Sequence, residues 1–235
     1  MRLAVIPARG GSKRTPRKNV RTFAGRPMIA WPIETALFSG VFDAVIVSTD
    51  DAEIISIAEA HGATIPFRRP AQLADDLTPT RPVVRHAIEA MEALGVAVRQ
   101  ICCLYATTPF ITAGDLVAGL SALETSENGF SVSVTHYAHP IQRALRLHAD
   151  GTVVPLDEAK LATRSQDLEE MVHDAGAFYW GTRDAFMSER SILASGSAAV
   201  VLPTWRVCDI DTEDDWTRAE LMFQAMFPNG KPDQR

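Results

Sequence analysis

Short apolar runs alternate along this chain with longer segments in which apolar residues recur every three or four positions. The runs predict strands over residues 3–6, 44–48, 100–105 and 130–135. The periodic segments predict helices over residues 28–39, 81–94 and 114–123. Since strands that alternate with helices usually pair in parallel, the pattern predicts an α/β protein with a mostly parallel sheet.

The boundaries of several elements carry their own signals. Pro27 stands near the start of the first predicted helix and Gly40 just past its end, which is the usual asymmetry of a helix. Asp50 and Glu53 resemble a capping box for a further helix. More short strands are predicted over residues 64–67, 178–180 and 200–205, and the closing helix carries an apolar stripe of Ala219, Met222, Phe223, Met226 and Phe227.

The alternation of predicted strands and helices stops after residue 136. From there to about residue 174 the sequence is polar and irregular, with HPIQRALRLHADG and RSQDLEEMVHD as its most distinctive parts. A segment of this length inside a compact domain is usually functional or an interaction element. We therefore expect a single domain over residues 1–228, with an inserted arm at about 137–174 and a flexible tail over 229–235.

Composition narrows the classes of function without selecting one. Of the 235 residues 46% are hydrophobic and 22% charged, which is enough for one full core. The net charge of −6 is spread along the chain, so neither nucleic acid nor a membrane is expected as a partner. Cys102, Cys103 and Cys208 lack the spacing of metal ligands and are predicted to be reduced thiols. With no signal peptide and no apolar run of membrane length, a cytoplasmic protein is expected.

The most informative stretch is a glycine-rich loop, IPARGGSKRTPRKN, over residues 6–19. It follows a predicted strand and so lies at the carboxyl edge of the sheet, where open α/β sheets bind ligands. Gly10 and Gly11 let the backbone approach a ligand and present amide donors to an anion. Five cations surround these glycines, a density that suits a triphosphate: Arg9, Lys13, Arg14, Arg17 and Lys18. The loop has neither P-loop nor dinucleotide-binding spacing, and a solvated basic turn is the alternative.

Two acids near the carboxyl end form a second candidate site. Asp209 and Asp211 occur in VCDIDTEDDW, directly after an apolar run. If that run is a strand, the single residue between them puts both carboxylates on one side of the pleat. Such a pair can hold a Mg²⁺ ion whose remaining positions are filled by water and substrate oxygens. The alternative is a helix cap, because Asp211 or Thr212 could begin the closing helix.

The loop and four further strings, in order along the chain, resemble the cytidylyltransferases that activate nonulosonic acids, the CMP-sialic acid synthetase family. The four strings are FAGRPMIAWPI, VIVSTDDAEI, RRPAQLADDLTPT and YATTPF. The resemblance implies a three-layer Rossmann-like nucleotidyltransferase fold with an inserted dimerisation arm, and a homodimer. It also implies transfer of CMP from CTP to an acidic nine-carbon sugar, with Mg²⁺ at Asp209 and Asp211. A non-catalytic nucleotide-binding module that uses the arm for protein interaction is the alternative from another class.

The same resemblance assigns roles to individual residues. Arg9, Lys18 and Asp211 would be catalytic. The residues expected to contact the nucleotide come from the loop and from the stretch 68–80, which could close over it: Ala8, Arg9, Gly10, Gly11, Ser12, Lys18, Asn19, Arg69, Asp76 and Thr80. Related nucleotidyltransferases often place an acidic metal ligand after the central strand. This chain has YATTP there, without a carboxylate, so the metal would depend on Asp209 and Asp211.

Two strings in and after the predicted arm are similar to the branch of the family that uses pseudaminic acid: IQRAL at residues 141–145 and RSQDLEEMVHDAGAFYWG at 164–181. This similarity implies an acceptor pocket lined by Arg143, Arg164, Gln166, His173, Asp174 and Tyr179. An arginine would suit the sugar carboxylate because its planar fork matches a carboxylate. An ordinary charged interaction arm is the alternative for each residue, and N-acetylneuraminate, legionaminate and Kdo are alternative acceptors.

Overall fold

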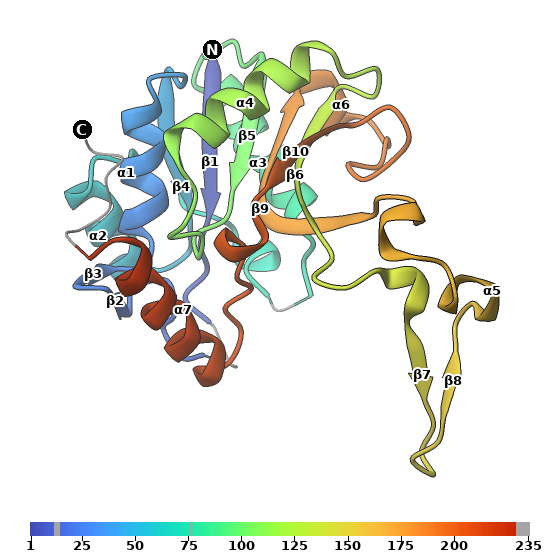
Figure 1. Cartoon of the computed structure of the whole chain (residues 1–235). Coiled ribbons are helices and arrows are strands. Elements are labelled where there is room, and N and C mark those ends of the chain that lie inside the picture. The colour runs from blue at the N-terminus through green and yellow to red at the C-terminus, as the bar shows by residue number, and fades with distance from the viewer. Residues whose placement is uncertain (12–14, 76, 229–235) are drawn as a thin grey trace.

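A six-stranded sheet forms the centre of the protein. The computed structural model describes residues 1–11, 15–75 and 77–228, so that Ser12, Lys13, Arg14, Asp76 and the predicted tail over 229–235 lie outside the described residues. The strands of the sheet are β1 Arg2–Pro7, β4 Ala44–Ser48, β5 Gln100–Leu104, β6 Phe130–His136, β9 Val172–Thr182 and β10 Ala198–Leu202. They lie in the order β10-β6-β9-β5-β1-β4 (Figure 1).

The directions of the strands decide which strand ends lie at the same edge of the sheet. β1 pairs in parallel with both β4 and β5, and β10 pairs in parallel with β6. β9 runs antiparallel to its two neighbours, β5 and β6. The predicted mostly parallel sheet is therefore confirmed. Because β9 runs the other way, its first residues lie at the edge where β1, β4 and β5 end.

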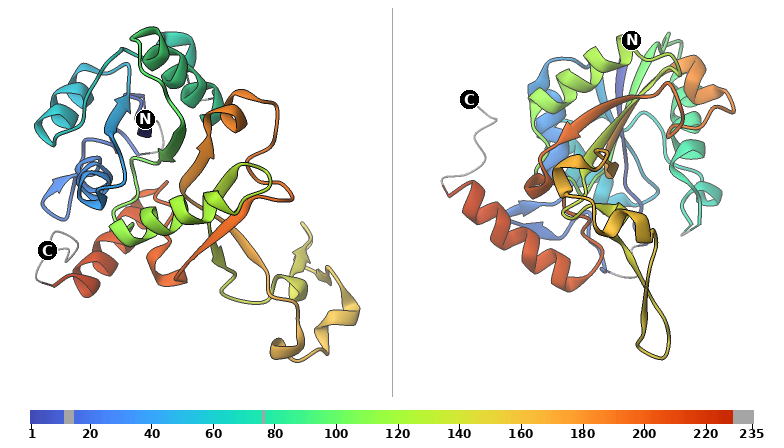
Figure 2. Two further views of the ribbon diagram at one scale, coloured as in Figure 1. Left: turned by 90° about the horizontal axis from the view of Figure 1, so that it is seen from above. Right: turned by 45° about the vertical axis from the view of Figure 1, so that its right-hand side comes forward.

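Helices cover both faces of the sheet, which confirms the predicted three-layer α/β fold. Along β1 the side chains of Ala4 and Ile6 enter one core, and those of Leu3 and Val5 enter the other. The first core is closed by α1 Ala30–Ser39, α2 Ala52–Ala60 and α4 Ala113–Glu124. The second is closed by α3 Thr80–Ala93 and α6 Arg183–Met187, and Figure 2 shows α3 and α4 on opposite sides of the sheet.

A third apolar cluster attaches the closing helix, α7 Glu213–Met226, to the body. Its centre is Phe23, which belongs to a small hairpin of β2 Thr22–Phe23 and β3 Arg26–Pro27. The Phe23 ring meets the rings of Trp216 and Phe223 edge to face at 5.6 and 5.4 Å between centroids. Helix α7 begins with a capping box between Thr212 and Asp215, so the predicted cap belongs to Thr212 rather than Asp211.

Two predictions about the segment after β4 are wrong. The cap of α2 is Asp51 instead of Asp50, because Asp51 Oδ1 accepts hydrogen bonds from the amides of Glu53 and Ile54. Residues 64–67 form a single bridge, from Thr64 to Ile46, instead of a strand. Pro66 follows within two residues and has no amide hydrogen for a ladder.

The polar segment after β6 leaves the body as a separate arm (Figure 1). It contains an antiparallel hairpin of β7 Leu145–Leu147 and β8 Val153–Pro155, followed by the short helix α5 Glu158–Leu161. The sheet begins again at Val172, whose partner is His136 at the end of β6. His173 and Asp174, which were predicted as the last residues of the arm, therefore belong to the sheet.

None of the three cysteines forms a disulfide. All three are free, and Cys102 and Cys103 of β5 are fully buried. Burial raises the pKa of Cys103 to about 12, so this thiol stays protonated at neutral pH. Within the described residues, every helix is too short or too polar to cross a membrane.

Candidate active site

Two adjoining clefts lie at the edge of the sheet where β1, β4 and β5 end. The smaller one, about 250 Å³, is called the basic cleft here, and its polar lining includes Arg9, Lys18, Asn19, Arg69, Thr80 and Tyr105. The larger one, about 570 Å³, is called the acidic cleft, and its polar lining includes Lys18, Tyr105, Asp174, Arg206, Asp209 and Asp211. Lys18, Tyr105 and Thr107 line both clefts, so the two volumes adjoin at these three residues, of which Lys18 carries the charge.

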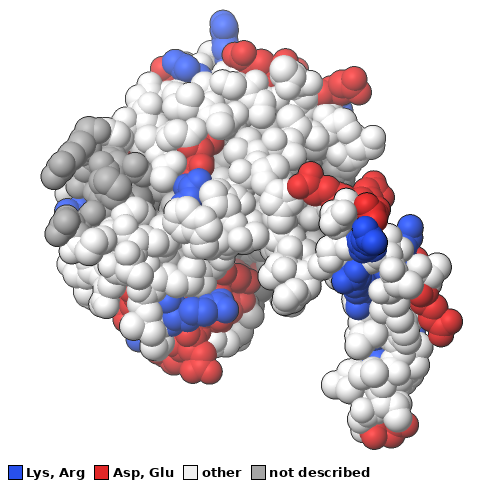
Figure 3. Space-filling view, viewed as in Figure 1, with Lys and Arg blue, Asp and Glu red and all other residues white. Residues whose placement is uncertain are grey.

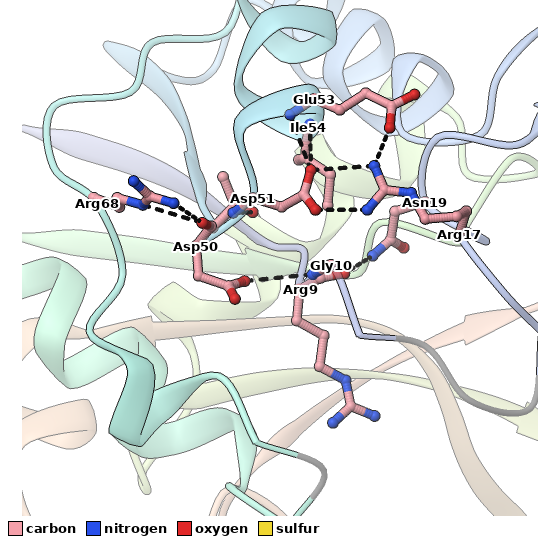
Figure 4. A network of polar contacts seen from close by, with 10 residues as sticks. Arg9, Gly10, Arg17, Asn19, Asp50, Asp51, Glu53, Ile54 and Arg68 are labelled. Carbon is pink, nitrogen blue, oxygen red and sulfur yellow. Dashed lines mark hydrogen bonds and ion pairs between the residues drawn. The ribbon is translucent and has the colours of Figure 1, made fainter.

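The start of the glycine-rich loop is held in place by backbone contacts. Ala8 is buried, and its amide donates to the carbonyl oxygen of Ser48 at 3.0 Å. The side-chain amide of Asn19 donates to the carbonyl oxygen of Arg9 at 3.0 Å, and only 8% of Asn19 is exposed. Arg9 in turn donates from Nη1 to the carbonyl oxygen of Asp75 at 2.6 Å. The loop therefore directs the Arg9 side chain into the basic cleft, away from the acids behind it (Figure 4).

Gly10 has a structural role that its sequence did not indicate. Its amide, predicted to face a ligand, lies 3.3 Å from Asp50 Oδ1. A Cβ atom at this position would lie 2.4 Å from Asp51 Oδ2, so only glycine fits between the loop and the start of α2 (Figure 4). Gly11 is exposed, and a Cβ atom added to it would meet no described atom within 4 Å.

Arg17 is tied to the body instead of facing the clefts. Its guanidinium group forms ion pairs with Asp51, at 2.5 Å, and with Glu53 (Figure 4). The hydrogen bond from Arg17 is the largest of the effects that lower the pKa of Asp51 to about 2. The expectation that all five cations of the loop surround a phosphate is therefore wrong for Arg17.

The floor of the basic cleft holds a nearly buried arginine. Arg69 is 5% exposed, and its guanidinium group donates to the hydroxyl and the carbonyl oxygen of Ser48. Burial lowers its pKa to about 10, which still leaves it charged at neutral pH. Arg9, Lys18 and Arg69 thus place three positive charges around a small cleft, an arrangement that suits an anion.

Two hydroxyl groups also line the basic cleft. Thr80 Oγ1, at the start of α3, lies 2.6 Å from the hydroxyl oxygen of Tyr105. Burial raises the pKa of Tyr105 to about 12, so this hydroxyl is neutral and available for hydrogen bonding. Five of the predicted nucleotide contacts accordingly line one cleft: Arg9, Lys18, Asn19, Arg69 and Thr80.

The paired acids line the acidic cleft, although the element that carries them differs from the prediction. β10 ends at Leu202, and Pro203 and a 3₁₀ turn follow, so Asp209 and Asp211 lie in irregular chain. The two carboxylates share the cleft because Ile210 between them is 1% exposed and packs in the core beneath α7. The prediction that a strand positions the pair is wrong, and a buried anchor residue does so instead.

Lys18 links the loop to these acids. Its Nζ atom donates to the carbonyl oxygen of Ile210 at 3.0 Å and lies 3.2 Å from Asp211 Oδ1. About a fifth of each charged side chain is exposed, at 22% for Lys18 and 24% for Asp211. The ammonium group is therefore held at the point where the two clefts join.

The acid pair fits a Mg²⁺ site that a substrate completes. Within the described ranges, no group of three or more His, Cys, Asp or Glu side chains could hold a metal ion. Mg²⁺ is commonly bound through one or two carboxylates together with phosphate oxygens and water, and it does not need a cage of protein ligands. Asp209 and Asp211 offer two carboxylates in one cleft, next to the cations that suit a phosphate chain.

Asp174 lines the same acidic cleft as these two acids. It lies in β9, where a register shift against β6 interrupts the ladder. Its carboxylate accepts hydrogen bonds from the Tyr179 hydroxyl at 2.5 Å and from the Gly176 amide at 2.8 Å. Burial is the first of the causes that raise the pKa of Tyr179, which stays a neutral donor. Of the predicted acceptor residues, His173 and Asp174 line the cleft, while Tyr179 reaches it through Asp174.

The remaining predicted acceptor residues lie on the arm. Arg143, Arg164 and Gln166 are absent from the lining of both clefts of their own chain, and Arg143 donates to the carbonyl oxygen of Thr163. Figure 3 shows basic side chains gathered on the part of the arm nearest the body. The arm and the cleft walls therefore do not come together within one chain.

Arg206 lines the acidic cleft but was not predicted from the sequence to have a role. Arg206 forms a two-pronged ion pair with Asp115, with N–O distances of 2.6 and 2.9 Å. The side chains are only 13% and 11% exposed. Asp115 also closes a capping box with Thr112 at the start of α4. That box is visible in the sequence, whereas a partner 91 residues away is not.

The chain resembles known proteins both in sequence and in fold. The profile of the cytidylyltransferase family matches residues 3–209. The chain is 43% identical over 223 residues to the pseudaminic acid cytidylyltransferase of Campylobacter jejuni, covering 95% of this chain and 96% of that one. It is 28% identical over 229 residues to the CMP-N,N'-diacetyllegionaminic acid synthase of Legionella pneumophila, covering 94% and 96%. The solved CMP:2-keto-3-deoxy-manno-octonic acid synthetase complexed with CTP has the same fold, with a TM-score of 0.69 at 17% identity over 96% of this chain and 99% of that one.

Proposed function

The chain belongs to the cytidylyltransferase family, and from this premise we propose that it transfers CMP from CTP to pseudaminic acid, giving CMP-pseudaminic acid and pyrophosphate. The observation that carries the proposal is the junction of the two clefts at Lys18. A triphosphate held by Arg9 and Arg69 in the basic cleft would present its α-phosphate at this junction. An acceptor in the acidic cleft would then meet that phosphate from the other side.

The chemistry needs no covalent intermediate with the protein. The anomeric hydroxyl oxygen of the acceptor forms a bond to the α-phosphorus, the bond from that phosphorus to the bridging oxygen breaks, and pyrophosphate leaves as the hydroxyl proton is released. Charge that develops on the phosphate oxygens would be stabilised by the Lys18 ammonium group, while Arg9 and Arg69 would hold the leaving phosphates. Positioning and electrostatics are the main contributions that such a site supplies.

We place Mg²⁺ at Asp209 and Asp211, because both carboxylates line the cleft that adjoins the proposed phosphate site. When bound there, the ion would neutralise phosphate charge as a Lewis acid. The protein's own part is to keep the two carboxylates facing the cleft and to hold Lys18 beside Asp211.

The choice of acceptor is supported by the relatives. Identity to the pseudaminic acid cytidylyltransferase of Campylobacter jejuni is 43%, against 28% to the legionaminic acid synthase, over similar lengths. Asp174 and His173 offer polar groups on the wall that an acceptor would contact. These polar groups suit the hydroxyl and amide groups of a sugar.

The test of the proposed function is release of pyrophosphate from CTP and Mg²⁺ across a panel of acids. We expect rapid release with pseudaminic acid, and release at least about a hundredfold slower with N-acetylneuraminic acid, legionaminic acid and Kdo, since sites that hydrogen-bond a substrate reject analogues whose polar groups do not match. The same panel with Asp211→Asn supplies the background rate. A different acid giving the fastest release would retain the reaction and replace the acceptor. Nucleotide binding without release for any acid would contradict the proposed transfer and favour a binding module.

We further propose that two copies of the chain form a dimer through the arm. A two-stranded hairpin is marginally stable alone, and an exposed apolar patch is typical of an interface. Eight large apolar side chains are exposed between β6 and β9: Tyr137, Leu145, Leu147, Val153, Val154, Leu156, Leu161 and Met171. Lys18 and Arg206, the cations that line the acidic cleft in the described part of the chain, are each paired with a carboxylate. Arg143 or Arg164 of a second copy would supply a further cation for the sugar carboxylate.

This arrangement predicts complementation between two inactive chains. One chain carries Asp211→Asn, and the other carries Arg143→Ala together with Arg164→Ala. In a mixed dimer, the intact cleft of the second chain meets the intact arm of the first, so random mixing should restore about a quarter of the wild-type rate. If each chain used its own arm, every site in the mixture would contain one defect and activity would stay at background. A mass determination in solution, giving a dimer or a monomer, checks the assembly independently.

A further inference from the structure

Thr15 is a buried polar residue that connects the glycine-rich loop to the acid pair. It is 0% exposed, and its hydroxyl donates to the backbone carbonyl oxygen of Asp211 at 2.9 Å, across 196 positions of sequence. The contact is partly buried, so a carbonyl that loses its donor there is only partly compensated by water. The hydroxyl of Thr15 therefore fixes how close the loop and Asp211 lie.

Lys18, in the same turn, holds the acidic segment at two further atoms. The amide of Lys18 donates to the carbonyl oxygen of Thr15 at 3.3 Å, which closes the turn. From there the Lys18 ammonium group reaches the carbonyl oxygen of Ile210 and the carboxylate of Asp211. The turn from Thr15 to Lys18 thus contacts two successive carbonyls and one carboxylate of a distant segment.

The acidic segment depends on such contacts because it has no regular secondary structure. Residues 207–211 belong neither to a strand nor to a helix. The amide of Asp211 lies 3.3 Å from Asp215 Oδ2, a contact within the start of α7 that does not reach the loop. Ile210 anchors the segment in the core, but a buried side chain leaves rotation of the neighbouring peptide open. The bond from Thr15 restrains that peptide directly.

Thr15 is well suited to this restraint. Its side chain is β-branched, so few rotamers are open to it, and its hydroxyl sits one bond from Cβ. It is absent from the lining of both clefts and would not touch a substrate. Its hydroxyl contacts the acid pair only at the backbone of Asp211.

We propose that Thr15 is a positioning residue whose hydroxyl holds Asp211 in the orientation that binds a divalent cation, and that it thereby sets the affinity of the site for that cation. This inference rests on the proposed function, since it takes Asp209 and Asp211 as the metal site. Supporting groups behind metal ligands commonly change metal affinity by about 10- to 100-fold when they are removed.

The test compares two substitutions that each keep one feature of the Thr15 side chain. Thr15→Val keeps the shape and removes the hydroxyl, whereas Thr15→Ser keeps the hydroxyl. Mn²⁺ binding is followed by electron paramagnetic resonance, with α,β-methylene-CTP present and no turnover. We expect the dissociation constant for Mn²⁺ to rise about tenfold in Thr15→Val and to stay close to wild type in Thr15→Ser. The Mg²⁺ concentration that gives half the maximal rate should shift in the same way.

Thr135→Val is a matched control for a general loss of stability. Thr135 is a buried threonine of β6, 2% exposed, whose hydroxyl donates to the carbonyl oxygen of Leu202 at 2.8 Å. Thermal unfolding should register both valine variants, but Mn²⁺ affinity should fall only in Thr15→Val. Equal Mn²⁺ affinity in Thr15→Val and wild type, or an equal loss in Thr135→Val, would overturn the inference while leaving the proposed function standing. A wild-type protein that releases pyrophosphate without any divalent cation would instead remove the metal site itself, and this inference with it.

Discussion

Replacing Asp211 with asparagine is expected to lower kcat for pyrophosphate release by about 10²- to 10³-fold, the usual range for loss of one preorganised electrostatic contact to a transition state. The substitution removes the negative charge that lies 3.2 Å from the Lys18 ammonium group and that we assign to the metal site. It leaves the backbone carbonyl that accepts the hydrogen bond from Thr15, so the segment should keep its place. The measurement is the rate at saturating CTP and acceptor, repeated over a range of Mg²⁺ concentrations.

Asp214→Asn is the matched control for this result. Asp214 lies three residues further on, exposed in the first turn of α7 and outside the lining of both clefts. Its substitution removes the same charge from the same region and should leave kcat within about twofold of wild type, since the dipole of a helix start acts weakly at an exposed position. Turnover by Asp211→Asn at the rate of this control would exclude Asp211 from the catalytic site.

The sequence predicted those features that depend on local pattern. Strand β4 and the layers of the fold follow from apolar periodicity, and the position of the loop after β1 follows from strand direction. The errors have local causes of another kind. Pro203 ends β10 before the acid pair, and Pro66 prevents a strand after α2. The apolar runs at both places therefore predicted more strand than the structure contains.

The contacts that define the clefts could not be predicted, because each joins segments far apart in the chain. Arg17 resembles one more cation of the loop until Asp51 and Glu53, more than thirty positions away, are placed beside it. The polar sequence around Asp174 predicts part of an arm, whereas the register of β9 against β6 brings this residue into the sheet. Composition cannot separate a cation that binds a phosphate from one that already holds a carboxylate, since both have the same local sequence.

Single substitutions in the ion pair between Arg206 and Asp115 should destabilise the protein strongly. Their effect should exceed the net contribution of the pair, because each leaves one charge without its partner. Arg206→Met leaves a nearly buried carboxylate without its partner, and Asp115→Asn leaves a nearly buried guanidinium group without its own. Each is expected to lower the free energy of unfolding by about 3 kcal/mol, because an uncompensated buried charge is costly. The side-chain oxygen of the introduced asparagine would still accept from Thr112, so the cap of α4 is preserved in this design. Urea denaturation of both variants gives the two values.

The double variant separates the pair from its surroundings. With both charges removed, the unfolding free energy should lie about 1 to 3 kcal/mol above the value expected from adding the two single losses, as is usual for residues in direct contact. Strict additivity would mean that the two groups act independently despite N–O distances of 2.6 and 2.9 Å. The double variant should fold. Its KM for the acceptor should nevertheless be raised, because Arg206 also lines the acidic cleft. A restored fold with an unchanged KM would assign Arg206 to stability alone, leaving the sugar carboxylate to be bound by Lys18 or by the arm of a second copy.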